Sequence, residues 1–228
     1  MSGRLYAVGL GPGDPELLTL KAQRLLASAD VVFLPVRDEH DSVARKIVAG
    51  AVDAGRLREL PFRMSRKPED NRERWQAHAE AIARTVEQGQ TAVFATEGDP
   101  LVYSTFIHVY GELLRSHPDL PVEIVPGVSS VTAGAAALRM PLADDKQRLA
   151  VVPATGEVLH AVATFDTVVI LKVSMALEAV LQALHTTGRT EQAIYVERAG
   201  WPEQRVVPDV ASLRKQKLDY FGQVIVRR

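Results

Sequence analysis

One turn decides the fold class: Thr96-Glu97-Gly98-Asp99-Pro100-Leu101-Val102-Tyr103-Ser104-Thr105. The apolar run over residues 91–95 before it predicts a buried strand, and residues 106–115 after it predict a helix. In open α/β sheets, ligands bind just beyond the carboxyl ends of the strands, which is where this turn falls. The sequence therefore predicts an α/β fold with a candidate binding turn at residues 96–105.

The chemistry of this turn narrows the ligand. Gly98 lets the backbone approach a ligand closely, and Pro100 stiffens the turn. Glu97 and Asp99 place two carboxylates there, so the turn is a poor cradle for phosphate and suits a cationic or hydroxyl-bearing ligand better. The stretch alone is equally compatible with an ordinary loop in which Asp99 caps a helix.

A second glycine turn, at residues 9–13, follows a predicted strand at 5–9. Its glycines do not have the G-x-G-x-x-G spacing, Pro12 removes an amide donor, and Asp14 would repel a pyrophosphate, so we exclude a nicotinamide dinucleotide site. Asp14 is suited to cap a helix whose first residue is Pro15. A turn that only packs its helix against the sheet remains an alternative.

A third turn, Pro126-Gly127-Val128-Ser129-Ser130, follows a predicted strand at 122–125 and precedes a helix of small residues at 131–138. Either serine could simply cap that helix. Its small residues would also let another body approach closely. A glycine turn at the end of a strand therefore occurs three times along the chain.

The remaining pattern predicts two domains, 1–117 and 118–228, with the proline-containing segment 116–121 as the linker. In the first half, strands are expected at 29–35 and 57–61 and helices near 15–27, 42–54 and 71–88. The second half suggests a partly antiparallel sheet, with strands expected at 148–154, 167–172, 193–198, 203–207 and 221–226 and helices at 157–163, 175–185 and 209–216.

Composition excludes several classes of function. The 228-residue chain is 46% hydrophobic with a formal net charge of −1, which gives no electrostatic reason to expect nucleic acid or a membrane surface as a partner. It has no cysteine, which excludes disulfides and thiolate chemistry and is compatible with a reducing compartment. We see no signal peptide, no membrane-spanning run and no metal-site histidine spacing, and expect a cytoplasmic protein without a metal.

Taken in order, the three turns resemble those of the tetrapyrrole (corrin/porphyrin) methylases, which use S-adenosylmethionine. The motifs are Val8-Gly9-Leu10-Gly11-Pro12-Gly13-Asp14-Pro15, Glu97-Gly98-Asp99-Pro100 and Val125-Pro126-Gly127-Val128-Ser129-Ser130. The resemblance covers nearly the whole chain, and the ordered set is far more specific than any single motif.

Within the family, details are similar to the branch that methylates C-20 of precorrin-2 or cobalt-factor II in cobalamin biosynthesis. Glu97 stands where uroporphyrinogen methylases tend to have glycine, and Tyr103-Ser104-Thr105 replaces their glycine-arginine-glycine stretch. That arginine therefore has no counterpart here. The same branch is suggested by the stretches 61–65, 196–199 and 220–221.

The resemblance implies two α/β domains, a mostly parallel N-terminal sheet and a mixed C-terminal sheet, with S-adenosylmethionine folded in a cleft between them. It also implies a homodimer and S-adenosylhomocysteine as product. Lys172 replaces a residue that is usually neutral in the family. The implied cofactor-binding residues are Pro12, Glu97, Gly98, Asp99, Val102, Tyr103, Ser104, Ser129, Ser130, Lys172 and Ala199.

The resemblance also implies a small-molecule tetrapyrrole substrate with many carboxylates, so we expect basic side chains to hold it. Arg37, Arg63, Arg66 and Lys67 are candidates by charge alone. No general base is identified, although Glu97, Asp99 and Tyr103 are possible proton acceptors. Two alternatives stay open: methylation at another position of a precorrin or uroporphyrinogen, and a non-catalytic tetrapyrrole- or nucleotide-binding module.

Overall fold

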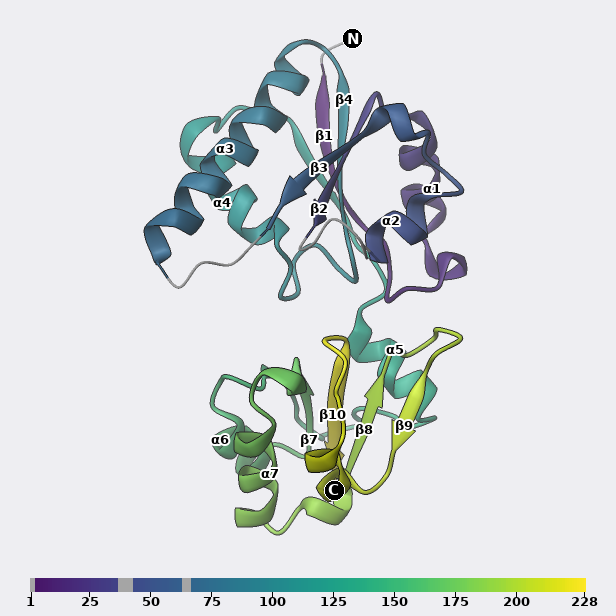
Figure 1. The fold of residues 1–228 in the computed structure, drawn as a ribbon, viewed down its shortest axis with the longest axis vertical. Helices are drawn as coiled ribbons and strands as arrows, with labels where there is room; N and C mark the ends of the chain where they lie inside the picture. The colour runs from purple at the N-terminus through teal and green to yellow at the C-terminus, as the bar shows by residue number, and fades with distance from the viewer. Residues whose placement is uncertain (1–2, 37–42, 63–66) are drawn as a thin grey trace. The chain divides into compact units, whose positions relative to one another are not determined.

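The computed structural model describes residues 3–36, 43–62 and 67–228. The chain divides into two compact units, Met1–Ser129 and Ser130–Arg228, here called the N-terminal unit and the C-terminal unit (Figure 1). This division falls later than the expected boundary after residue 117. The reason is that strand β5 (Val122–Val125) pairs with β1 (Arg4–Gly9) and so completes the first sheet.

The N-terminal unit contains a five-stranded sheet in the order β3-β2-β4-β1-β5. Its other strands are β2 (Val31–Val36), β3 (Leu57–Pro61) and β4 (Thr91–Thr96). All four pairings are parallel. Since β1 and β4 are buried along nearly their whole length, they read as continuous apolar runs, as central parallel strands do.

Helices cover both faces of this sheet (Figure 1). Helices α3 (Pro68–Glu87) and α4 (Phe106–Ser116) pack on one face, where Phe94 of β4 meets Ile82 and Phe106 in one apolar cluster. Helix α1 (Leu20–Ser28) contacts β1, and α2 (Val43–Val48) contacts β2. The sheet is therefore buried on both sides, and its strand ends are the natural place for a site.

The first helix begins later than its sequence pattern predicts. Asp14 does act as a cap, because its carboxylate accepts a hydrogen bond from the amide of Glu16 at 2.8 Å. The turn that it caps is a short 3-10 helix, Pro15–Leu17, and α1 then starts with Thr19 as its own cap. In the predicted linker at 116–121, Ser116 ends α4 and the remaining residues form a loop that leads to β5 within the N-terminal unit.

The C-terminal unit contains a mixed sheet in the order β6-β7-β10-β8-β9, which confirms the expected antiparallel component. Only β6 (Leu149–Pro153) and β7 (Thr167–Leu171) run parallel. Strand β10 (Gly222–Arg227) lies antiparallel between β7 and β8 (Ala193–Glu197), and β9 (Arg205–Val207) pairs with β8. The last strand of the chain is thus at the centre of the sheet.

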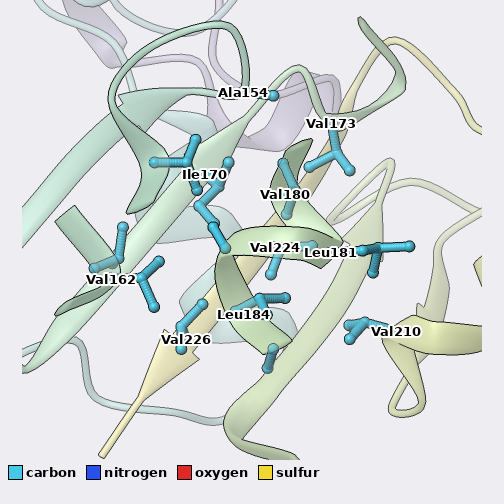
Figure 2. Close-up of a cluster of buried hydrophobic side chains, with 14 of the residues drawn as sticks. Ala154, Val162, Ile170, Val173, Val180, Leu181, Leu184, Val210, Val224 and Val226 are labelled. Atoms are coloured by element: carbon cyan, nitrogen blue, oxygen red, sulfur yellow. The ribbon is translucent and has the colours of Figure 1, made fainter. Parts of the chain in front are cut away.

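Two faces of this sheet are covered by different helices (Figure 1). On one face, α6 (Val158–Thr164), α7 (Leu177–Thr186) and the 3-10 helix Val210–Lys215 share a large core with Ile170, Val224 and Val226 (Figure 2). The other face carries the small-residue helix α5 (Ser130–Ala137), which packs through Val131 and Ala133. Short 3-10 helices at Val173–Met175 and Thr190–Gln192 complete the unit, as Ala54–Arg56 does in the N-terminal unit.

Candidate cofactor site at the strand ends

The three glycine turns predicted from the sequence meet at one edge of the N-terminal sheet. Strands β1 and β4 are parallel and in register, so their carboxyl ends, Gly9 and Thr96, lie side by side. Beyond them, Gly11 and Gly98 exchange backbone hydrogen bonds of 3.3 and 2.7 Å, which forms an antiparallel bridge between the first and second turns. These two turns are therefore held as one piece of backbone.

The third turn packs against the other two through glycine. A Cβ atom on Gly127 would lie 2.2 Å from the carbonyl oxygen of Gly98 and 2.8 Å from the Cα of Gly9. A Cβ on Gly9 would in turn lie 2.6 Å from the Cα of Gly127. No residue with a side chain fits such an approach, so the sequence requirement for glycine here is one of space.

Asp99 joins the second turn to the third. One carboxylate oxygen accepts a hydrogen bond from the amide of Leu101 at 2.9 Å, and the other accepts from the amide of Gly127 at 3.1 Å. Asp99 is therefore not a helix cap, as one interpretation of the stretch had it, because α4 begins at Phe106. Hydrogen bonds from amides to a carboxylate are strong, so this contact fixes the relative position of the two turns.

Gly98 presents open backbone. Its φ angle is +66°, in the left-handed region that favours glycine, and a Cβ placed there would meet nothing within 4 Å. Leu101, Val102 and Tyr103 follow directly, and each exposes between 42% and 53% of its surface. The second turn thus combines bare backbone with accessible apolar side chains, which is a surface suited to an organic ligand.

Glu97 has its carboxylate placed against the start of α2. The amide of Ala44, in the first turn of that helix, donates a hydrogen bond to Glu97 Oε1 at 3.3 Å. Burial raises the pKa of the Glu97 carboxyl, and the backbone hydrogen bonds from Glu97 itself and from Ala44 partly oppose this. A carboxylate with a raised pKa gains from a nearby positive charge, because the cation offsets the lost hydration.

Ser104 faces inward. Its hydroxyl shares a hydrogen bond of 3.1 Å with Thr96 and accepts another of 3.1 Å from the amide of Phe106. The Ser104 side chain therefore stabilises the start of α4, and its backbone is the part left to meet a ligand. The neighbouring Tyr103 has a φ of 51°, an uncommon conformation for a bulky residue that often accompanies function.

Pro12 and Ser129 lie in the first and third turns of the N-terminal unit. The C-terminal unit carries three further predicted site residues, each at a distinct strand or helix end. Ser130 is the first residue of α5. Lys172 directly follows β7 with a φ of 58°, and its ammonium group lies 5.8 Å from the ring centre of Tyr220. Ala199 follows β8 and is buried against Ala133 of α5.

Three of the four basic residues proposed to hold substrate, Arg37, Arg63 and Arg66, lie outside the described residues. The fourth, Lys67, is the N-cap residue that directly precedes α3. Across residues 3–36, 43–62 and 67–228, no three histidine or acidic side chains gather at metal-binding distances. Over those same ranges, no helix is long and apolar enough to cross a membrane.

Comparison with known proteins decides the family. The family model described as Tetrapyrrole (Corrin/Porphyrin) Methylases matches residues 4–213. The chain belongs to this family. The two sheets, parallel and mixed, and the turn cluster are thus features of a tetrapyrrole methylase, and the family uses S-adenosylmethionine.

Several known proteins resemble the chain over 96% or more of its length. It is 33% identical to the cobalt-precorrin-2 C(20)-methyltransferase of Salmonella typhimurium, over 100% of this chain and 98% of that protein. It is 37% identical to the cobalamin biosynthesis protein CobIJ of Mycobacterium bovis, where it spans 96% of this chain but only 45% of that protein. A crystal structure of the uroporphyrin-III C-methyl transferase of Thermus thermophilus, complexed with S-adenyl homocysteine, matches with a TM-score of 0.73 and 30% identity, covering 99% and 98% of the two chains.

The methylase fold brings some of the predicted residues together, whereas others, such as Ala199, pack in the interior of the C-terminal unit. Gly98 and Asp99 of the second turn meet the first and third turns within the N-terminal unit. Sequence patterns did not single out Gln223, a buried polar residue in β10. The available signal was one polar residue at the start of an apolar run, Gly222-Gln223-Val224-Ile225-Val226.

Proposed function

We propose that the chain transfers a methyl group from S-adenosylmethionine to C-20 of precorrin-2 or of its cobalt-containing counterpart in cobalamin biosynthesis. The structural observation that most supports this proposal is the cluster of three glycine turns, which leaves the backbone of Gly98 open at the carboxyl ends of a parallel sheet. A cobalt-precorrin-2 C(20)-methyltransferase aligns with nearly the whole chain at 33% identity, and this supports the choice of substrate and position.

The residues present fit S-adenosylmethionine. At Gly98, open space over bare backbone lies beside accessible apolar side chains, as an adenosyl group needs. The carboxylate of Glu97, whose pKa is raised by desolvation, suits a ligand with a positive charge. We propose that contacts come from Pro12, Glu97, Gly98, Val102, Tyr103, Ser129, Ser130, Lys172, Ala199 and the backbone of Ser104, with Asp99 holding the turns in place.

When bound, S-adenosylmethionine supplies an electrophilic methyl group on sulfur, and the acceptor is the electron-rich meso carbon of a reduced tetrapyrrole. The chain's own work is to hold that carbon in line with the methyl–sulfur bond and to keep water away. The rigid bridge between Gly11 and Gly98 serves this alignment because it leaves the turns little freedom to move. The products are S-adenosylhomocysteine and the methylated tetrapyrrole, and the proton that leaves the methylated carbon passes to a base or to solvent.

The same turns disfavour the nucleotide-binding alternative. Glu97 and Asp99 would repel a phosphate, and the carboxylate of Asp99 already accepts the amide of Gly127 that a phosphate would need. The test below distinguishes methylation at C-20 from methylation at another position of the tetrapyrrole. The replacement of a glycine-arginine-glycine stretch by Tyr103-Ser104-Thr105 speaks for the C-20 reaction.

We also propose that the protein acts as a homodimer in the cytoplasm. The wider family is typically dimeric, and the chain contains no cysteine, which suits a reducing compartment. Sedimentation equilibrium would measure the molar mass of the purified protein directly. A mass equal to one chain at micromolar concentration would contradict the dimer.

The decisive experiment is anaerobic incubation with S-adenosylmethionine and precorrin-2, with and without inserted cobalt. Mass spectrometry should show the gain of one methylene unit, and NMR should place the new methyl group at C-20. A methyl group at another ring position would instead support the alternative methylase. Binding of S-adenosylhomocysteine without turnover of either tetrapyrrole would overturn the proposed activity.

A further inference from the structure

Gln223 is a polar residue at the centre of the C-terminal sheet. It lies in β10 between Leu171 of β7 and Val196 of β8, and only 3% of its surface is exposed. Side chains alternate along the strand: Val224 and Val226 face the large core under α6 and α7 (Figure 2). Gln223 contacts α5 on the opposite face, where Ile225 packs with Val131.

The amide of Gln223 makes one specific contact with α5. Its Nε2 atom donates a hydrogen bond of 2.7 Å to the backbone carbonyl of Ser130, the first residue of the helix. The orientation of the amide follows from chemistry, because only the nitrogen can donate to a carbonyl. Gly134 makes room for it, since a Cβ there would lie 2.0 Å from Nε2.

Stability alone does not account for a glutamine here. The neighbouring residues on this face, including Leu171, Val196 and Ile225, are apolar and buried. No donor among the residues that the structure describes reaches Gln223 Oε1, which is itself buried. A buried amide oxygen without a donor costs about 1–3 kcal/mol, so an apolar side chain of similar length would stabilise the unit better.

The place of Gln223 explains its use. It bonds to Ser130 directly, its register partner Leu171 immediately precedes Lys172, and its register partner Val196 packs with Ala199. The three parts of the C-terminal unit proposed to contact the cofactor thus border one buried amide. A polar group at such a junction orients backbone, since an apolar side chain has no directional bond to offer.

We propose that Gln223 is a positioning residue for S-adenosylmethionine, which fixes the carbonyl of Ser130 and the first turn of α5, with Gly134 as its necessary partner. This inference rests on the proposed function. Gln223 need not touch the cofactor; it sets the backbone that does. The buried amide costs stability in the free protein. Ligand binding then costs less, because the first turn of α5 is already ordered.

The test replaces the amide and keeps the shape. In Gln223→Met, the affinity for S-adenosylhomocysteine, measured by isothermal titration calorimetry, should fall about tenfold or more, while the midpoint of thermal unfolding stays equal or rises. The matched control is Ile225→Met, on the same strand and face, which should leave the affinity unchanged. Affinity equal to wild type in Gln223→Met would overturn the inference.

A second variant gives a readout that packing cannot imitate. In Gln223→Glu, a protonated carboxyl can donate to the Ser130 carbonyl, whereas the ionised form cannot, and burial raises the pKa of such a group. The affinity of this variant relative to wild type should therefore recover as the pH falls from 8 to 5. A ratio that stays constant with pH would count against the positioning role.

The Gly134 partner is tested by a double-mutant cycle. Gly134→Ala alone should weaken S-adenosylhomocysteine binding, because the new methyl group displaces the amide, and added Gln223→Ala should remove that clash. Effects that simply add would contradict the pairing. If the wild-type protein does not bind S-adenosylhomocysteine, the proposed function falls together with this inference; normal wild-type binding with unaffected variants refutes the inference alone.

Discussion

Single backbone positions carry most of the candidate site. At Gly9 and Gly127, the chain approaches itself so closely that no Cβ fits, whereas at Gly98 the space is open and the constraint is a φ of +66°. These are different physical reasons for the same residue type. The first two positions hold the turns together, and the third leaves room for something else.

Gly98→Ala separates ligand contact from backbone strain. The alanine should lower the free energy of unfolding by about 1 kcal/mol, the cost of a left-handed residue, and should weaken S-adenosylhomocysteine binding at least tenfold by calorimetry. Gly188→Ala is a matched control, because Gly188 has a φ of +67° and equally open space. Equal losses of affinity in both variants would show that the turn is not the binding surface. A valine at 98 is the poorer test because its branched side chain adds strain.

Asp99→Asn tests the link between the second and third turns. Asparagine can still accept from Leu101, but its amide nitrogen would face the Gly127 amide, donor against donor. We expect a loss of about 1–3 kcal/mol in the free energy of unfolding, measured with urea, and weaker binding of S-adenosylhomocysteine. Asp14→Asn, which replaces a carboxylate that accepts a hydrogen bond from the amide of Glu16, should cost almost nothing.

At the scale of elements, one carboxylate organises the edge of the C-terminal sheet. Glu197 at the end of β8 accepts hydrogen bonds from Arg205 of β9 at 2.7 Å, from the hydroxyl of Tyr195 at 2.5 Å and from the amide of Asp219 at 3.0 Å. Burial acts to raise the pKa of Glu197, but these hydrogen bonds outweigh it and hold the pKa below the usual range. The strand pair and the loop before β10 therefore depend on one ionised group.

Glu197→Gln should show this dependence as a function of pH. Because the folded-state pKa lies below the unfolded value of about 4.3, the stabilisation is present above that value and is lost as the pH falls through the folded-state pKa. At pH 7 we expect about 2 kcal/mol of lost stability in urea unfolding, and a smaller difference from wild type below about pH 4. Glu178→Gln, which breaks an exposed pair with Arg214, should change stability by less than about 1 kcal/mol.

Element type was predictable because periodicity reports burial. Strands β2 and β4 and the long helix α3 were predicted within a few residues, because the two strands are unbroken apolar runs and the helix has a long apolar pattern. Local capping chemistry was harder to place. Asp14 and Asp99 are both good caps in isolation, but one ends up capping a 3-10 turn and the other bonds Gly127, a partner distant in the sequence.

At the scale of the whole molecule, the domain division was missed for a similar reason. Prolines 118 and 121 suggested a linker, but the next strand pairs with β1 across more than a hundred residues of sequence. Long-range pairing leaves no local mark on a sequence. The motif order, by contrast, identified the family correctly, because three short turns at consistent spacing carry information that a single turn does not.

Ligand-linked stability gives a test on the intact protein. S-Adenosylhomocysteine at about a hundred times its dissociation constant should add about 2.7 kcal/mol to the unfolding free energy and raise the midpoint of thermal unfolding. NAD at the same concentration should produce no shift, because the turns offer carboxylates where a pyrophosphate needs amides. A shift with NAD and none with S-adenosylhomocysteine would favour a nucleotide-binding module.

The mutual contact of Gly9, Gly98 and Gly127 has a consequence for biosynthesis of the protein itself. These residues lie at the ends of the first, fourth and fifth strands of the N-terminal unit, so their junction cannot close until nearly all of that unit has left the ribosome. A nascent chain halted at residue 117 would leave β1 as an open sheet edge, prone to pair with other chains. Capture of an adenosyl ligand by these turns therefore requires that translation and folding of the N-terminal unit are complete.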